Sequence, residues 1–317
     1  MSMNFALTGA SGYIAPRHLK AIKETGNNLV AAIDPHDSVG ILDSHFPNVN
    51  FFTEFERFDR FIEKLRRQDP ENAIKYVTIC SPNYLHDAHA RFALRIGADA
   101  VCEKPLVLNP WNVDALKEIE EESGHRIWTI LQLRVHPSLI ALKEKIMAEK
   151  SKAKKDVRLT YITSRGPWYQ VSWKGQVERS GGLATNIGIH FFDMLMWLFG
   201  EVQYNEVHIA TANKIGGFIE LQDARVQWFL SIDRDDLPRE ISEKGQSTFR
   251  SITINGEEVE FSGGFTDLHT IVYKEILAGN GFGLDEARPS IVLVHSIRNT
   301  HPTGAKTDSH PFIQKLK

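Results

Sequence analysis

The sequence predicts an α/β protein in two parts: an N-terminal doubly wound parallel sheet, followed by an α+β part with a large, open and mostly antiparallel sheet. Three observations predict it. Up to about residue 133, short apolar runs alternate with amphipathic stretches. Beyond about residue 155, runs that alternate apolar with polar residues follow one another with few helices between them. A glycine turn directly follows the first apolar run.

In the first half, six apolar runs are expected to be strands that are buried on both faces of the sheet. They are residues 4–10, 29–34, 49–52, 73–80, 99–102 and 126–133. Four stretches between them carry apolar residues at helical spacing, which is typical of helices that cover a sheet. These are residues 13–25, 55–65, 84–96 and 110–123.

In the second half, residues 187–199 and 268–277 are expected to be helices, and Asn255-Gly256 is a hairpin signal. The lysine-rich stretch 150–155 is expected to be a solvated link near the boundary. One face of this sheet must meet water or a partner, and several strands carry large apolar residues, so we expect a homo-oligomer. These residues include Ile209, Phe218, Trp228 and Phe229. The expected strands are residues 157–163, 205–211, 218–221, 224–232 and 251–261.

The composition excludes several classes of function. The 317 residues fit two domains of about 150 residues each. With 37 Lys and Arg against 40 Asp and Glu, the net charge is -3, so we expect no nucleic-acid partner. The longest strongly apolar run, residues 191–199, is too short for a membrane span of about 20 residues, and no signal peptide is visible, so we expect a cytoplasmic protein without a membrane partner. Two cysteines and scattered histidines predict neither a disulfide framework nor a metal site.

The glycine turn predicts a bound dinucleotide. The first strand ends in Gly9-Ala10-Ser11-Gly12, and Tyr13 and Ile14 lead into a helix. Small residues let the backbone approach a pyrophosphate, whose charge the free N–H groups of the helix N-terminus bind. Asp34 ends the second strand, where a carboxylate can bind the adenosine ribose, and residues 35–38, up to Ser38, contain no arginine for a 2′-phosphate. Turn, helix and acid together favour an NAD-binding Rossmann fold over a purely steric role for the glycines.

Three later motifs carry a family resemblance. The fourth strand ends in Ser81-Pro82-Asn83 with His86 close behind, and the fifth ends in Glu103-Lys104-Pro105. Gly181-Gly182 precedes Gly188-Ile189-His190-Phe191-Phe192-Asp193 in the second half. With these motifs nearly the whole chain resembles the glucose–fructose oxidoreductase and inositol dehydrogenase (Gfo/Idh/MocA) family. The resemblance implies NAD as cofactor, sheet-to-sheet dimers that often pair into tetramers, and a cofactor site that includes Ser81, Pro82, Asn83, His86, Glu103 and Lys104.

A closer resemblance is to the bacterial UDP-N-acetylglucosaminuronate 3-dehydrogenases of lipopolysaccharide O-antigen synthesis. It implies oxidation of the 3-hydroxyl of a UDP-linked amino-sugar acid to a ketone, with NAD as acceptor. In some of these relatives 2-oxoglutarate reoxidises the bound NADH. Two alternatives stay open: a 3-dehydrogenase of UDP-N-acetylglucosamine, whose C6 is an alcohol, and a non-catalytic protein that binds NAD or a sugar nucleotide. The stretches that carry this resemblance are residues 15–18, 51–55, 161–166, 168–175, 186–190 and 264–279.

Alcohol oxidation needs hydride transfer to the nicotinamide and removal of the hydroxyl proton, and Lys104 and His190 are the two candidates for the proton. The alternatives are a surface lysine for Lys104 and a packed core histidine for His190. Many family members carry a carboxylate where this chain has Asn186, and an amide there cannot act as a base but suits an anionic sugar. A diphosphate and a carboxylate call for cations and hydroxyl donors. We expect substrate ligands among Gln132, Arg134, Arg165, Tyr169, Lys174, Thr185, Asn186 and His190.

The two parts of the chain are expected to have different functions. Residues 1–134 would form the NAD-binding Rossmann domain. Residues 135–317 would form the domain for substrate binding and oligomerisation, with C-terminal residues packing back on the first domain.

Overall fold

The computed structural model describes residues 2–149, 153–259 and 267–315, and the chain forms two compact units. The first unit holds the chain up to Val135 together with a later segment that ends at Arg288. The second unit begins at His136 and takes up the chain again at Pro289. The boundary expected from the sequence lay between residues 134 and 135.

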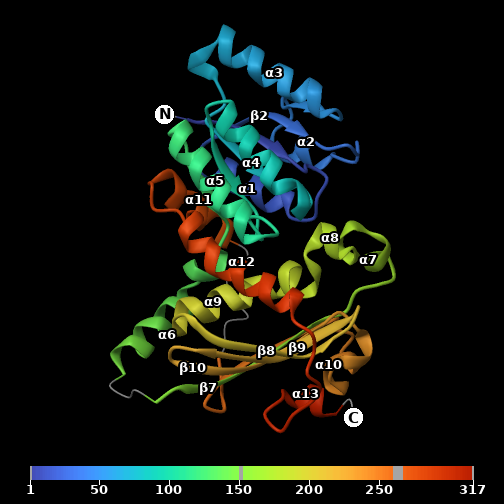
Figure 1. Cartoon of the computed structure of the whole chain (residues 1–317). Helices are drawn as coiled ribbons and strands as arrows, with labels where there is room; N and C mark the ends of the chain where they lie inside the picture. Colours follow the sequence, from blue (N-terminus) through green and yellow to red (C-terminus); the bar gives the residue numbers. More distant parts are fainter. Residues whose placement is uncertain (1, 150–152, 260–266, 316–317) are drawn as a thin grey trace. The chain divides into compact units, whose positions relative to one another are not determined.

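A six-stranded parallel sheet forms the first unit, in the order β3-β2-β1-β4-β5-β6. The strand order reverses between β1 and β4, which is where doubly wound sheets bind ligands. The predicted doubly wound parallel sheet is confirmed. Its strands are β1 (Asn4–Thr8), β2 (Asn28–Ile33), β3 (Asn50–Phe52), β4 (Tyr76–Ile79), β5 (Asp99–Cys102) and β6 (Ile127–Thr129). The connecting helices are α1 (Ala15–Glu24), α2 (Ile41–His45), α3 (Phe55–Gln68), α4 (His86–Arg95) and α5 (Pro110–Ser123) (Figure 1).

The late helix α11 (Leu268–Leu277) completes the core of this unit by packing against α1. Tyr273 and Val272 of α11 share one apolar cluster with Phe5 of β1 and Leu19 of α1. The later part of the first unit, described for residues 267–288 and called the return segment below, also covers the sheet edge, because the Thr129 N–H donates to the Phe282 carbonyl at 2.7 Å. Strand β6 ends at Thr129, although the sequence predicts a strand to residue 133; Gln132–Val135 form a turn of 3-10 helix instead.

The second unit contains a six-stranded sheet in the order β12-β11-β7-β10-β9-β8. Only the β7–β10 pair is parallel, so the prediction of a mostly antiparallel sheet is confirmed. The strands are β7 (Lys155–Thr163), β8 (Val202–Ala210), β9 (Lys214–Leu221), β10 (Ala224–Ser231), β11 (Thr248–Ile254) and β12 (Glu257–Glu258). The helices are α6 (Pro137–Ala148), α7 (Trp168–Val171), α8 (Val177–Ser180), α9 (Ile189–Phe199), α10 (Arg239–Glu243), α12 (Leu284–Asn299, which begins in the first unit) and α13 (Pro311–Gln314).

Several elements differ from the sequence prediction for local physical reasons. Strand β9 starts at Lys214, four residues early, because Gly217 lets β8 approach; a Cβ there would lie 2.0 Å from the Glu206 carbonyl oxygen. Helix α12 was not predicted, since its internal Pro289 is typical of a helix break, and α6 was missed as well.

The Asn255-Gly256 hairpin is confirmed, and both residues have positive φ, as a two-residue hairpin turn requires. Parts of three expectations lie outside the described residues: 150–152 of the lysine-rich link, 260–261 of the last predicted strand, and 264–266 of the tail that carries the closer resemblance.

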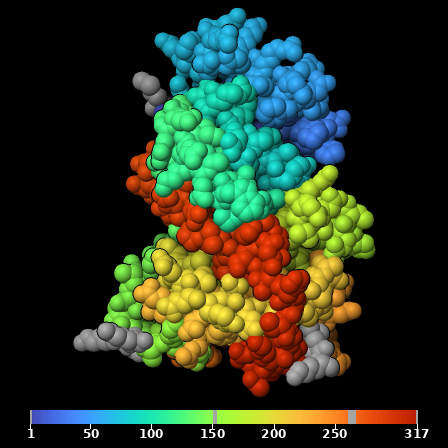
Figure 2. Space-filling view, viewed as in Figure 1, coloured from blue at the N-terminus to red at the C-terminus, as the bar shows by residue number. Residues whose placement is uncertain are grey.

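Both faces of the second sheet are covered by the same chain near its centre. Trp228 packs edge-on against Phe192 of α9, with ring centroids 5.1 Å apart. The neighbouring Phe229 points to the opposite face, where His310 and Phe312 stack on its ring. Helices α9 and α13 accordingly lie on opposite sides of the sheet in Figure 1, and Figure 2 shows the C-terminal segment (red) on the surface of this unit.

This arrangement removes two of the four residues on which the apolar-residue argument for an oligomer depends. Trp228 and Phe229 are both fully buried within the chain, because consecutive strand residues face opposite covers. The other two, Ile209 and Phe218, are half-buried, so the oligomer stays a prediction.

One helical stretch, residues 177–199, is long and apolar enough to cross a membrane by length and composition. The 18-residue window that meets this test is 67% buried inside the protein. Core helices of globular units pass the same test, and α9 packs on the sheet in this way.

A buried histidine in the C-terminal segment predicts acid sensitivity. His310 is 1% exposed, its Nε2 lies 2.9 Å from the Thr160 hydroxyl, and its Nδ1 accepts the Phe312 N–H. Burial lowers the pKa of His310 to about 3. Between about pH 3 and 6.5 the unfolded chain therefore binds the extra proton, so the free energy of unfolding falls as the pH drops through this range, by up to about 1.4 kcal/mol per pH unit from this group.

We expect His310→Asn, which keeps a side-chain acceptor for the Phe312 N–H, to flatten that pH dependence. Urea unfolding at pH 4 to 8 measures it, with His301→Asn at an exposed position as the matched control. Parallel pH profiles for the wild type and His310→Asn would contradict the assignment.

Candidate active site

The glycine turn between β1 and α1 forms a backbone cradle. Gly9 has φ +83°, and a Cβ on it would lie 2.6 Å from the backbone of Cys80 and Ser81, so only glycine fits where the loop after β4 passes. Helix α1 begins at Ala15 with no side-chain cap and with proline in its first turn. The N–H groups of Ala15 and Arg17 already bond the Gly12 and Ile14 carbonyls. The N–H groups of Tyr13 and Ile14, which have no acceptor among the described residues, and the positive end of the helix dipole fit the pyrophosphate of a dinucleotide.

Asp34 follows β2 directly and lies beside that cradle. Its side chain is buried, Oδ2 accepts the Ser11 N–H at 3.0 Å, and Oδ1 accepts the His36 N–H at 2.9 Å. Each oxygen keeps a lone pair, so the fixed carboxylate can still accept bonds from a ribose diol. Ser38 is exposed in the following loop, and Tyr13 is 87% exposed next to the turn. These residues fit the adenosine half of NAD.

The loops after β4 and β5 are tied together by His86. Its Nε2 lies 2.8 Å from the Ser81 carbonyl oxygen and its Nδ1 lies 2.7 Å from the Pro105 carbonyl oxygen. Burial lowers the pKa of His86, so the neutral ring donates to one carbonyl at a time. Although the sequence suggests a cofactor ligand, the structure shows His86 as a buried clamp that shapes both loops. Asn83 is buried in a 3-10 turn of the same loop, next to the half-buried Pro82.

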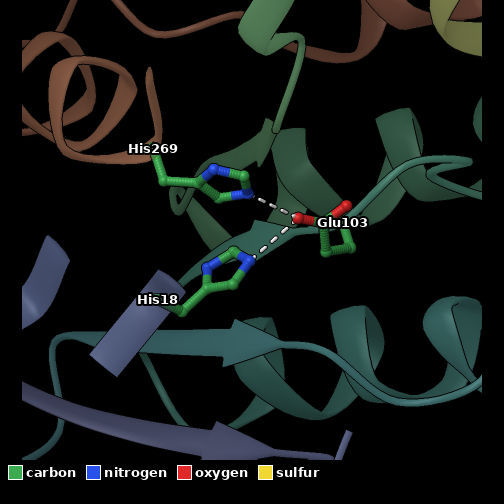
Figure 3. A group of neighbouring side chains, drawn as sticks. All are labelled: His18, Glu103 and His269. Atoms are coloured by element: carbon green, nitrogen blue, oxygen red, sulfur yellow. Dashed lines mark hydrogen bonds and ion pairs between the residues drawn. The ribbon is translucent and has the colours of Figure 1, made fainter. Parts of the chain in front are cut away.

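Glu103 and Lys104 face different surroundings. Glu103 was expected among the cofactor ligands, but its carboxylate turns into the core, where Oε1 accepts from His18 and His269 (Figure 3). The next residue, Lys104, is half-buried at the carboxyl end of β5, and its N–H donates to Glu103 Oε2 at 3.2 Å. Lys104 therefore lies at the strand end where a doubly wound sheet binds its ligand.

Of the two polar residues expected to bind substrate after β6, Arg134 is engaged within the chain and Gln132 has an acceptor that a ligand could use. The Arg134 guanidinium donates to the Glu286 carbonyl at 3.1 Å and lies over the Phe282 ring, so it holds the return segment. Gln132 Oε1 is buried with no hydrogen-bond donor among the described residues. A buried acceptor without a donor is rare, so a ligand hydroxyl would suit Gln132.

In the second unit, the expected substrate residues gather around α7. Tyr169 is buried, and its hydroxyl accepts from the Asn186 amide at 2.9 Å. The Lys174 ammonium lies over the Trp168 and Trp173 rings, 5.4 and 4.9 Å from their centroids. Burial and the charge of the exposed Arg165 lower the pKa of Lys174. Sequence reasoning did not assign Trp168, although an indole at this short spacing from Trp173 and Lys174 was a visible signal.

The Gly181-Gly182 motif leads into an unusual helical turn. Both glycines have positive φ, and a Cβ on Gly181 would lie 2.6 Å from the Thr185 side chain. Residues Ala184–Gly188 then form a π-helical turn, which often marks a functional site, before α9 begins. Thr185 is fully buried, and its hydroxyl has no partner among the described side chains and backbone groups.

The turn also carries Asn186, and half-buried His190 is the second residue of α9. Lys104 belongs to the first unit and His190 to the second, so their pairing stays a prediction.

Comparison with known proteins places both units in one family. Residues 3–130 match the model of an oxidoreductase family with an NAD-binding Rossmann fold, and residues 153–227 match the C-terminal alpha/beta domain of that family. The chain is 54% identical to the WlbA (WbpB) dehydrogenase from Thermus thermophilus, solved in complex with NAD and alpha-ketoglutarate (TM-score 0.94). The match covers 98% of this chain and 99% of that chain.

A second structure of the Thermus enzyme, in complex with NAD and UDP-GlcNAcA, matches at 53% identity with a TM-score of 0.93, over 98% of this chain and 99% of that chain. Inositol 2-dehydrogenase from Rhizobium meliloti is 29% identical over 63% of this chain. That match spans 56% of the length of the inositol dehydrogenase. A separate match to the putative oxidoreductase YteT from Bacillus subtilis spans 36% of the length of that protein.

Asp34 is expected to set the choice of cofactor. In Asp34→Asn the charge that repels a 2′-phosphate and one charge-assisted acceptor are lost, so NAD should bind about tenfold more weakly while the ratio of NADP to NAD affinity rises. Isothermal titration with both cofactors measures this, with Asp37→Asn in the exposed part of the same loop as the control. Equal affinities of the wild type for NAD and NADP would contradict the role given to Asp34.

Proposed function

The chain belongs to the oxidoreductase family with an NAD-binding Rossmann fold, and from this premise we propose that it is a UDP-N-acetylglucosaminuronate 3-dehydrogenase. It oxidises the 3-hydroxyl of the UDP-linked sugar acid to a ketone, with NAD as acceptor, in the synthesis of a lipopolysaccharide O-antigen sugar. The observation that carries the proposal is the 53% identity, over 98% of this chain, to a dehydrogenase solved in complex with NAD and UDP-GlcNAcA.

The first unit holds the cofactor through the Gly9–Gly12 turn and the Asp34 carboxylate. When bound, NAD supplies the acceptor for the hydride that leaves C3 of the sugar. The proton of the 3-hydroxyl goes to a neutral nitrogen of this chain, either Nζ of Lys104 or the ring of His190. The C3–H bond breaks with its electron pair, the O–H bond breaks as a proton, and a C=O double bond forms.

The second unit recognises an anionic sugar nucleotide. Arg165 and Lys174 supply positive charge for the diphosphate or the sugar carboxylate. Tyr169, Thr185 and Asn186 supply hydroxyl and amide groups, and the amide of Asn186 donates to Tyr169 without adding a negative charge.

We also propose 2-oxoglutarate as the second substrate, because the Thermus enzyme was solved with alpha-ketoglutarate beside NAD. After the keto sugar leaves, 2-oxoglutarate would accept at its keto carbon the hydride that NAD took from C3, and at its keto oxygen the proton held by Lys104 or His190; 2-hydroxyglutarate is released and NAD is restored. The cationic groups that bind a sugar carboxylate suit a dicarboxylate for the same reason.

Turnover without added NAD tests both substrates. We expect the purified protein, given UDP-N-acetylglucosaminuronate and 2-oxoglutarate, to form 2-hydroxyglutarate over many turnovers. Turnover only with UDP-N-acetylglucosamine would favour the alternative sugar. If NADH forms steadily when free NAD is supplied, and no 2-hydroxyglutarate forms when 2-oxoglutarate is supplied, the recycling step is refuted. Inactivity with every UDP-sugar would favour a binding protein.

Lys104→Met provides the inactive reference for this assay. Loss of one proton-transfer group costs about 10²–10⁴-fold in kcat, with NAD affinity unchanged. Lys75→Met at an exposed position is its control.

The protein is proposed to be a cytoplasmic homo-oligomer, a dimer or tetramer, by analogy with its family. Light scattering should give a mass of at least twice 35.9 kDa at micromolar concentration, and a monomer mass would refute the oligomer. Cell fractionation tests the location.

A further inference from the structure

A buried polar cluster surrounds Glu103, the residue that precedes Lys104, in the core of the first unit (Figure 3). Glu103 Oε1 is 2.9 Å from His18 Nε2 and 3.0 Å from His269 Nε2. His18 Nδ1 is 2.8 Å from the Tyr273 hydroxyl, which is 2.8 Å from the Thr78 hydroxyl. All five residues are at most 6% exposed.

The protonation of this cluster follows from its contacts. Burial acts to raise the pKa of Glu103, but hydrogen bonds from His18 and His269 outweigh it and hold the pKa well below its usual range. Burial lowers the pKa of His18, so its ring is neutral and donates from Nε2 while Nδ1 accepts from Tyr273. The carboxylate is thus ionised and takes an imidazole N–H from each of two helices.

Hydrogen bonding accounts for this geometry better than a metal does. The ligand atoms of His18, Glu103 and His269 lie within 4.8 Å of one another, which is close enough for a metal ion. However, a single oxygen, Oε1, lies at hydrogen-bond distance from both imidazoles. The three residues are buried, and a structural zinc site takes four protein ligands, whereas this cluster offers three.

The cluster joins three parts of the chain that matter for the reaction. His18 lies on α1, whose N-terminus follows the glycine turn, and His269 lies on α11. The second oxygen of Glu103 accepts the N–H of Lys104. The backbone of Lys104 is therefore tied, through one carboxylate, to the helix that begins at the cofactor cradle.

We propose that Glu103 is a positioning residue that fixes Lys104 relative to helix α1, and that His18 and His269 hold it in place. The proposal rests on the proposed function, because it takes Lys104 as a group that handles the substrate proton. A misplacement of about 1 Å can cost about 10²-fold in rate. Glu103 therefore acts on kcat without touching the substrate.

Glu103→Gln separates this role from simple packing. An amide of the same shape has one acceptor, so it cannot accept from both imidazoles at one end and from the Lys104 N–H at the other. His269→Leu removes one of the two imidazole donors to Glu103, and His269→Gln restores an N–H donor of similar reach. Tyr273→Phe is the matched control, because it breaks the buried bonds to His18 and Thr78 while leaving the contact between Glu103 and Lys104 intact.

We expect Glu103→Gln and His269→Leu to lower kcat at least about tenfold, with the KM for the sugar nucleotide and the Kd for NAD within about twofold of the wild type. His269→Gln should recover most of the loss. Tyr273→Phe should lower Tm but keep kcat. Equal losses of kcat in Tyr273→Phe and Glu103→Gln at equal loss of Tm would show a purely structural role, as would failure of His269→Gln to rescue. If Glu103→Gln does not fold, the comparison of kcat between His269→Leu and His269→Gln tests the positioning role by itself.

A second readout does not depend on the sugar substrate. The labelling rate of the Lys104 amine by trinitrobenzenesulfonate, measured by peptide mass spectrometry, should fall when NAD binds to the wild type. In Glu103→Gln this protection should be largely lost although NAD still binds. If the wild type fails to oxidise any UDP-sugar but shows this pattern, the proposed function fails and the positioning role stands. Unchanged protection in Glu103→Gln, or a stoichiometric metal in the purified protein by elemental analysis, would overturn the role.

Discussion

A carboxylate charge inside the apolar core of the first unit must be compensated where it lies, and much of the chain is arranged around this requirement. Glu103 takes its imidazole donors from α1, near the start of the sequence, and from α11, near its end. Helix α11 can reach that position only if the chain returns to the first unit after the six described strands of the second sheet. Once there, it also fills the core beside Phe5 and leads to the segment that closes the edge of β6.

The two units offer binding groups of different kinds. The first unit presents backbone N–H groups and one fixed carboxylate, both set by the glycine turn and the end of β2. The second presents side chains: the Lys174 ammonium over two indole rings, a buried tyrosine and the amide of Asn186. Backbone groups suit a cofactor that many enzymes share, whereas side chains can change with the substrate while the scaffold stays the same.

The sequence predicted most of the architecture because the signals were local. The alternation of apolar runs, the glycine turn and the Asn255-Gly256 hairpin each depend on neighbours in the chain, and all are confirmed. Hydrogen-bond partners that are distant in the sequence could not be predicted from it. Nothing near Glu103 in the sequence indicates that its carboxylate turns inward, because its donors come from residues 18 and 269.

The sequence prediction did not include helix α12, whose internal Pro289 is typical of a helix break. It also began β9 too late, because the role of Gly217 depends on the approach of β8, which is distant in the sequence. For the candidate site, residue types were predictable from motifs. Which side of each loop they face was not: His86 binds two backbone carbonyls, and Arg134 holds the return segment.

The return of α11 also has a consequence for synthesis on the ribosome. The bond from His18 to Tyr273 spans 255 residues, so the N-terminal sheet emerges long before the helix that completes its core. From Thr129, where the last strand of the sheet ends, to Tyr273, synthesis at about 5–20 residues per second takes roughly 7 to 29 seconds. During that time Glu103 lacks its hydrogen bond from His269, and the side of α1 that α11 covers is exposed. The nucleotide-binding half therefore cannot reach its final form as it is made, and translation must be nearly finished before the first unit closes.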